Sequence, residues 1–121
     1  VDRRQRQMCI RDSARGYLDI NCASCHSSAA GVGNTSGLYL EYWRSFGLEV
    51  GECKPPIAAG DGSGGLQYDI VPGNADLSIL HFRMNSNETE IRMPESGRSV
   101  TDIEGVQLIA DWINAMEPEQ C

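Results

Sequence analysis

The chain has 121 residues, of which 40% are hydrophobic and 22% charged, and its formal net charge is −7. This length supports one domain with one core. The negative charge argues against a nucleic-acid partner, because phosphate binding needs clustered Lys and Arg side chains. No run of apolar residues is long enough for membrane insertion. An acidic surface instead favours encounter with a positively charged protein or adjoining domain.

The first 13 residues differ from the rest of the chain, since they hold four of the ten basic residues and few apolar ones. We predict that residues 1–13 form a non-native or disordered tail and that residues 14–121 form the domain. The same segment contains no apolar run of signal-peptide length. The sequence is therefore expected to be a mature or truncated piece of a longer protein.

A short first helix is predicted from about Ala14 to Cys22, because Ser13 is a suitable N-cap and apolar residues follow at helical spacing. Residues 38–46 fit either a short strand pair or a single helical turn. Residues 47–73 are rich in Gly and Pro and predict a wrapping loop, with a brief extended piece near residues 68–71.

Two more helices are predicted in the second half of the chain. Leu77 to Arg83 forms about two turns, and a longer helix runs to about Met116. Its start fits a capping box, in which Thr101 is the N-cap and the side chain of Glu104, three residues later, accepts from the backbone N–H of Thr101. One face of this last helix is apolar, with Ile103, Val106, Ile109, Ala110 and Ile113 at helical spacing.

The segment Cys22-Ala23-Ser24-Cys25-His26 has the C-x-x-C-H spacing of covalent haem attachment. In a turn or helical segment, residues three apart lie on the same side, so two thiols can reach the vinyl groups on one porphyrin edge. His26 can then place an imidazole nitrogen on the iron. The motif predicts one covalent haem c on Cys22, Cys25 and His26, in the periplasm or another exported location.

Other interpretations of the two cysteines and the histidine fit the sequence less well. A thioredoxin-like CxxC needs a βαβ setting that the chain does not show. A structural zinc site would recruit Cys22, Cys25, Cys53 and either His26 or His81, but no second CxxC or HxxxH pair exists. A disulfide between Cys22 and Cys25 would be strained.

A low-spin electron-transfer haem needs a second axial ligand, and Met is the usual one in cytochromes c. We favour Met93, because Pro94 follows it and it lies on a loop before the last helix. Met84 is the main alternative ligand, and its other interpretation is a side chain that fills space in the core. His81 is a weaker rival, since a lone His on a helix is usually a surface or satisfied residue.

For several other residues the sequence allows more than one role. Cys53 is either a free thiol or the disulfide partner of Cys121. Two haem propionates would need cationic or hydrogen-bonding partners, and each candidate is equally compatible with a plain surface or core role. The candidates are Arg44, Lys54, Arg83, Arg92 and Arg98, with Trp43 or Tyr68 as further donors.

With CASCH near the start, Met93-Pro94 late and an amphipathic last helix, the chain resembles a class I cytochrome c domain. It is more closely similar to the C-terminal haem domain of a family of uncharacterised exported bacterial proteins, some of them dihaem cytochromes. That similarity covers roughly residues 14–116. The segments that carry it are GYLDINCASCH, GECKPPIAAG, YDIVPGNADLSIL, RMPESGRS and EGVQLIADWI.

The resemblance implies an all-α, cytochrome c-like fold with short helices and long loops wrapped round a haem. The first and last helices would cross, and Gly16 would allow close approach. The implied function is one-electron transfer through His/Met-ligated iron, to a redox partner protein or an adjoining domain. The alternative is a haem module of a larger oxidoreductase or sensor with a labile sixth ligand. The domain is expected to be an electron carrier rather than an enzyme by itself.

Overall fold

The computed structural model describes residues 2–57, 59–95 and 100–121. Within these ranges the regular structure is helical, and the only pairing between extended segments is two isolated bridges, Glu52–Ile70 and Tyr68–Ser78. The expected all-α class is confirmed. The elements are α1 (Arg3–Cys22), α2 (Gly31–Ser36), η1 (Leu48–Val50), η2 (Gly60–Ser63), η3 (Ala75–Leu77), α3 (Ile79–Met84) and α4 (Ile103–Ala115).

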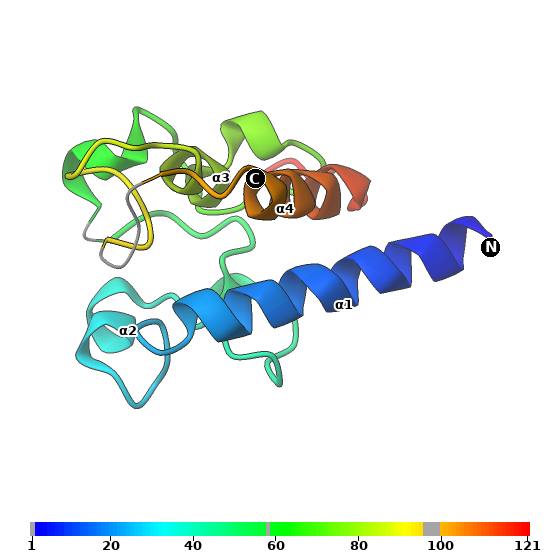
Figure 1. The fold of residues 1–121 in the computed structure, drawn as a ribbon, viewed down its shortest axis with the longest axis horizontal. Helices are drawn as coiled ribbons and strands as arrows, with labels where there is room; N and C mark the ends of the chain where they lie inside the picture. The colour runs from blue at the N-terminus through cyan, green and yellow to red at the C-terminus, as the bar shows by residue number, and fades with distance from the viewer. Residues whose placement is uncertain (1, 58, 96–99) are drawn as a thin grey trace.

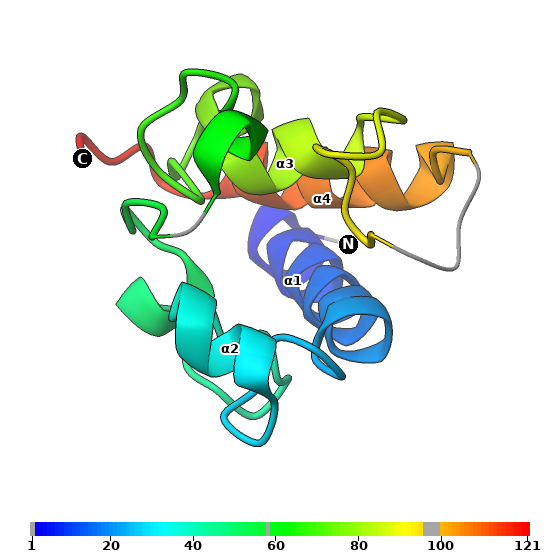
Figure 2. The same cartoon turned by 90° about the vertical axis from the view of Figure 1, so that its left-hand side faces the viewer.

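The molecule has two halves that meet along α1 and α4. Figure 1 shows α1 and α2 on one side, with α3 and α4 on the other. In Figure 2, turned by 90°, α4 lies across α1, and these two helices form the main contact between elements. The expected crossing of the first and last helices is confirmed. Among the described residues, no helix is both long and apolar enough to cross a membrane.

The first helix is longer than its apolar pattern predicts. It begins at Arg3 rather than near Ala14, so the expected boundary is wrong. Asp2 caps it by accepting a hydrogen bond from the backbone N–H of Gln5 at 2.8 Å, and the Arg- and Gln-rich turns have good helix propensity. Gln7 also donates to the carbonyl of Ala115 at 3.3 Å. The non-native origin of residues 1–13 stays a prediction, because helical conformation carries no information about origin.

The core lies between α1 and α4. Leu18 on α1 and Ile109 and Ile113 on α4 are all fully buried. Each fully buried side chain of this size contributes about 1.5–3 kcal/mol relative to an exposed one. The interface between the two crossing helices is therefore one large part of the hydrophobic core, which also includes Leu40, Val50 and Ile70.

The close approach between the helices occurs at a different glycine from the expected one. Nothing lies within 4 Å of the position that a Cβ on Gly16 would take, so Gly16 does not provide the approach. A Cβ on Gly105 would instead collide with the phenol of Tyr17. The Tyr17 hydroxyl donates to the carboxylate of Asp102 at 2.8 Å across the same junction. Tyr17 therefore packs over the first turn of α4.

The start of α4 also differs from the expected capping box. Asp102, not Thr101, is the N-cap, and its carboxylate accepts from the backbone N–H of Gly105 at 3.0 Å. Ile103 becomes the first helical residue and is 77% exposed, so it does not belong to the buried face. The later apolar positions of α4 are buried, as their spacing predicts.

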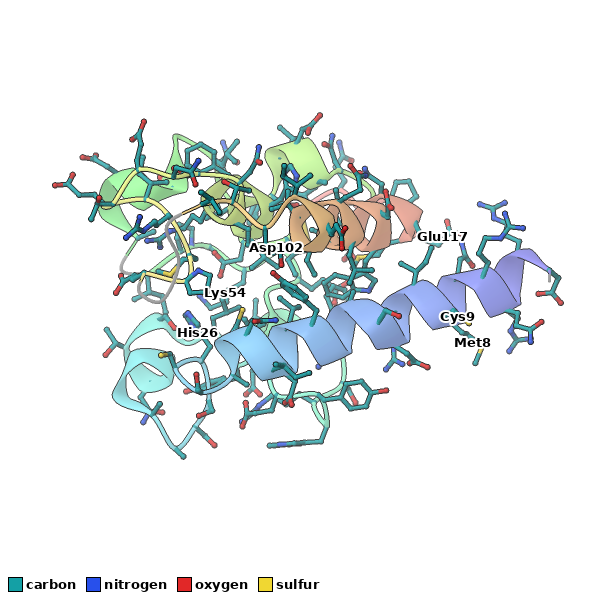
Figure 3. The ribbon with its side chains drawn as sticks, viewed as in Figure 1. Met8, Cys9, His26, Lys54, Asp102 and Glu117 are labelled. Carbon is teal, nitrogen blue, oxygen red and sulfur yellow. A yellow bond between two sulfur atoms is a disulfide. The ribbon has the colours of Figure 1, made fainter. Side chains whose placement is uncertain are left out.

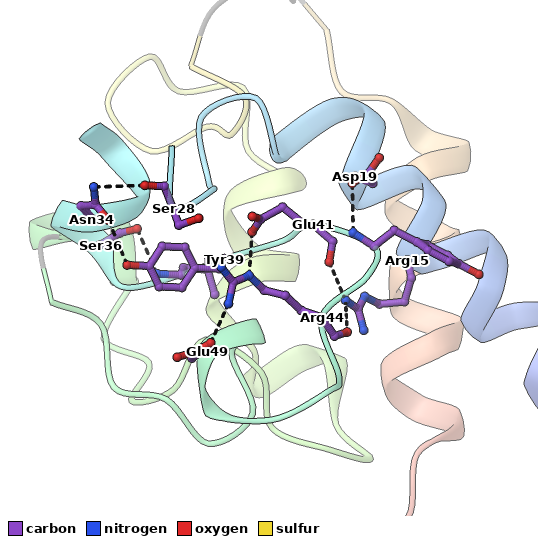
Figure 4. Close-up of polar contacts among 11 residues, drawn as sticks. Arg15, Asp19, Ser28, Asn34, Ser36, Tyr39, Glu41, Arg44 and Glu49 are labelled. Carbon is purple, nitrogen blue, oxygen red and sulfur yellow. Dashed lines mark hydrogen bonds and ion pairs between the residues drawn. The ribbon is translucent and has the colours of Figure 1, made fainter. Parts of the chain in front are cut away.

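The middle of the chain forms loops and short turns rather than a strand pair. Residues 75–77 first make the 3-10 turn η3, so α3 begins at Ile79 instead of Leu77. The turn at residues 41–44 is held against α1 by Arg15, whose Nη2 donates to the carbonyls of Glu41 (3.0 Å) and Arg44 (2.8 Å), as Figure 4 shows. Buried Ile70 anchors the brief extended piece that the sequence predicts near residues 68–71.

Cys53 and Cys121 form a disulfide that joins residues 68 positions apart. The open question of a free thiol or a bridge is therefore resolved in favour of the bridge. It ties the C-terminal residues to the loop that precedes Lys54. A bridge of this kind is typical of proteins that fold in an oxidising compartment.

Gly105→Ala is expected to destabilise the protein by about 1–3 kcal/mol, because the new methyl group must displace the Tyr17 ring or the α4 backbone. Gly16→Ala is the matched control, since it adds the same methyl group to a helix interior with open space around it. It should be neutral or stabilise by up to about 1 kcal/mol. Urea unfolding at fixed pH measures both, and equal losses would show that Tyr17 does not pack on Gly105.

Candidate haem-attachment site

The two motif thiols lie at the end of α1. Cys22 is the last residue of the helix, and the backbone N–H groups of Cys25 and His26 donate to its carbonyl at 3.2 and 2.8 Å. The motif is thus one tight turn that continues the helix. Cys22 is half-buried, Cys25 is exposed, and both are free thiols.

Burial raises the pKa of the Cys22 thiol to about 11, and the neighbouring Cys25 adds to the shift. The Cys22 side chain is therefore a neutral S–H at neutral pH. Thioether formation adds an S–H group across a vinyl bond, so it requires an unbridged thiol, which Cys22 provides. A zinc ligand would instead have to lose the proton.

The half-buried His26 is held by the segment that follows α2. Its backbone carbonyl accepts from the N–H of Leu40 at 2.8 Å. Its imidazole Nδ1 lies 3.4 Å from the hydroxyl of Ser36 and a further hydrogen bond joins the ring to the backbone of Leu38. Partners of this kind fix the orientation of an imidazole ring.

The pKa of His26 is lowered, chiefly because burial disfavours the imidazolium, and the charges of Arg83 and Lys54 act in the same direction. The ring is therefore neutral at neutral pH, which is the form that binds a metal. Figure 3 shows His26 and Lys54 toward the same end of the molecule, between its two halves.

The zinc alternative loses one of its ligands. Cys53 is in the disulfide with Cys121, so it offers no thiolate. Within residues 2–57, 59–95 and 100–121, no group of three or more His, Cys, Asp and Glu side chains is placed to hold a metal ion.

Met93 lies on a loop that is attached to the end of α3. Its backbone N–H donates to the carbonyl of Arg83 at 3.0 Å, and the Nε of Arg83 donates to the carbonyl of Ile91 at 2.8 Å. The Met93 side chain is half-buried. The charge of Glu95, two residues further on, acts weakly on the imidazole of His26.

The rival ligands have other surroundings. Met84 is only 4% exposed and packs in the hydrophobic core. Met116 packs against the same core from the end of α4, and Met8 is exposed on α1. His81 is half-buried on α3. The core position of Met84 agrees with its role as core filler.

The candidate propionate partners divide into two groups. Arg44 already has partners, since its guanidinium lies 2.7 Å from both Glu41 and Glu49 (Figure 4). It also stacks over the ring of Trp43, 4.4 Å from the ring centroid. Trp43 is 71% exposed. The Tyr68 hydroxyl donates to the carbonyl of Cys121 at 3.3 Å.

Of the remaining cations, Arg92 donates to the carbonyl of Glu95 at 3.4 Å, and Arg98 lies outside the described residues. Lys54 and Arg83 are the two whose charges act on His26.

Sequence reasoning missed two parts of this region. One is the Ser36–Leu40 segment that orients His26, and the other is Asp69, whose carboxylate lies 3.4 Å from the ammonium of Lys54. Neither lies in a motif. The contacts join loops that have no periodic pattern, so no local signal in the sequence marks them.

Two surface hollows lie away from the motif. One is bordered by the first turns of α1 and the residues that follow α4, and the other by the loop of residues 65–74 and the C-terminal tail. Cys22, Cys25, His26 and Met93 border neither of them.

Comparisons with known proteins give no assignment. No protein-family model matches the chain, and neither a curated protein nor a solved structure is significantly similar to it. Function must therefore be argued from the residues themselves.

Proposed function

We propose that this chain binds one haem c through thioethers at Cys22 and Cys25, with His26 and Met93 as axial ligands, and serves as a one-electron transfer module. The observation that carries the proposal is the single turn at the end of α1, which presents two free thiols three residues apart and a neutral imidazole beside them. The donor set matches the chemistry of covalent haem attachment in number and spacing.

Each residue has a separate task in this proposal. The helical turn fixes the separation of the two thiols, and the Ser36–Leu40 segment orients His26, which would supply the first axial ligand. Met93 would supply the second axial ligand from a loop attached to α3. When bound, the haem supplies a reversible one-electron couple at its iron.

The surroundings support an exported electron-transfer module. The Cys53–Cys121 disulfide is the kind that persists in the periplasm or outside the cell. The net charge of −7 favours a positively charged redox partner or adjoining domain, through an attraction that salt weakens.

The test is expression of the full chain together with the c-type cytochrome maturation machinery. The purified protein is expected to show a Soret band, one haem per chain by the pyridine haemochrome assay, and haem that survives acid-acetone extraction. Expression without the machinery is the control and should yield little covalent haem. A colourless protein from the maturing host would exclude the proposed function.

A further inference from the structure

Two side chains of α1 attach a turn from the middle of the chain to that helix. Arg15 is 1% exposed, and its Nη2 donates to the carbonyls of Glu41 (3.0 Å) and Arg44 (2.8 Å). One helical turn later, the carboxylate of Asp19 accepts from the backbone N–H of Tyr42 at 2.9 Å. Figure 4 shows both attachments, which hold the turn from the side of α1.

The attached turn is continuous with the segment that holds His26. The N–H of Leu40 donates to the carbonyl of His26 at 2.8 Å. The ring of His26 contacts the Ser36 hydroxyl and the backbone of Leu38. We call residues 36–44 the clamp segment. It contacts His26 through its first residues and α1 through its last ones.

The helix α1 therefore supports both parts of the CxxCH motif. Arg15 lies about two helical turns before Cys22, so the two side chains project from the same side of the helix. Cys22 is the last residue of α1 and carries the first motif thiol. The thiols are thus attached to α1 directly, and the imidazole of His26 is attached to it through the clamp segment.

The arginine in this position has a cost in stability. The Nε and Nη1 of Arg15 are buried, and neither has a hydrogen-bond partner among the described residues. Burial lowers the pKa of Arg15 and the charge of Arg11 adds to this effect, whereas Tyr42 and Asp19 act in the opposite direction. Buried donors without partners destabilise a fold, and an apolar side chain of similar size would avoid that cost. Core packing alone therefore does not account for an arginine here.

We propose that Arg15, assisted by Asp19, is a positioning residue for the proposed axial ligand His26, because it fixes the clamp segment to the helix that carries the thiols. This inference rests on the proposed function. Thioethers would fix the porphyrin relative to α1, and a clamp segment fixed to the same helix would hold the imidazole at a constant orientation to that porphyrin.

Arg15→Met is expected to speed the hydrogen exchange of the Leu40 N–H by about tenfold, since two hydrogen bonds that hold the clamp segment are lost. The exchange of the Ile109 N–H, in the buried face of α4, should stay within about threefold of the wild-type rate. Arg4→Met is the matched control, because it makes the same substitution at an exposed position of the same helix. NMR of the full chain, with and without attached haem, measures these rates.

The orientation of the imidazole gives a second readout, which a merely structural role would not change. In the chain expressed with the maturation machinery, Arg15→Met should retain its covalent haem but shift the haem methyl proton resonances of the ferric form. The pattern of these resonances depends on the orientation of the axial imidazole plane. Arg4→Met should leave the pattern unchanged. Wild-type methyl resonances in Arg15→Met overturn the inference, and so does equal acceleration of exchange at Leu40 and Ile109.

Asp19→Ala keeps the test decisive if Arg15→Met does not fold. It removes the acceptor of the Tyr42 N–H from a half-buried position and should speed the exchange of the Leu40 N–H by about three- to tenfold. Asp19→Asn retains an oxygen acceptor and should keep that rate within about threefold of the wild type. A wild-type rate in Asp19→Ala overturns the inference. A wild type without haem instead removes the proposed function, while exchange in the haem-free chain still reports the attachment of the clamp segment.

Discussion

Covalent haem attachment is expected to disappear completely when Cys22→Ala and Cys25→Ala are combined. The two thiols lie in one turn at the end of α1 and are free, so they are the residues that can form two thioethers to one porphyrin edge. Each single variant should keep one thioether and thus a covalent but spectrally shifted haem. Haem staining on denaturing gels and acid-acetone extraction measure the attachment.

Cys9→Ala is the matched control for the thiol substitutions. Cys9 is a free and exposed thiol on the same helix, more than three turns before Cys22. Its loss should leave haem content and spectrum unchanged. Haem that resists acid-acetone in the Cys22→Ala, Cys25→Ala variant would contradict attachment through the motif, and loss of haem in Cys9→Ala would do the same.

Periodicity predicts the helical frame well where apolar residues repeat. The buried positions of α4 and its end near Met116 follow directly from their spacing. The first turns of α1 escape this reasoning, because a run of Arg and Gln has helix propensity but no apolar repeat. The glycine at which the two helices approach each other closely was also predicted wrongly, as Gly16 instead of Gly105. Which glycine faces a partner depends on the rotation of both helices, and the Tyr17–Gly105 contact is set by the Asp102 cap.

The candidate site is predictable only where it is contiguous in sequence. Cys22, Cys25 and His26 form one turn, so their spacing alone gives the proposed chemistry. The Cys53–Cys121 bridge spans 68 positions, and cysteine pairing cannot be deduced from the sequence. The pairing of Lys54 with Asp69 similarly depends on how two loops without a repeating pattern lie against each other.

Met93→Ala is expected to remove the long-wavelength charge-transfer band of ferric haem with a Met ligand and to open the sixth site to carbon monoxide in the reduced protein. Met93 lies on a loop attached at Arg83, and the charges of Arg83 and Glu95 act on His26. The soft thioether favours ferrous iron, so its loss should also lower the reduction potential. Optical spectra of the oxidised protein and carbon monoxide titration of the reduced protein measure both effects.

Met84→Ala is the matched control for Met93→Ala, because it removes the same side chain from a different environment. Met84 is 4% exposed in the core, so its truncation should lower the free energy of unfolding by about 2–5 kcal/mol and leave the band in place. The two variants thus separate ligation from packing. If the band vanishes in Met84→Ala and persists in Met93→Ala, the core residue is the ligand and the loop assignment is wrong. Carbon monoxide binding to the reduced wild type would instead favour a haem with a labile sixth ligand over an electron carrier.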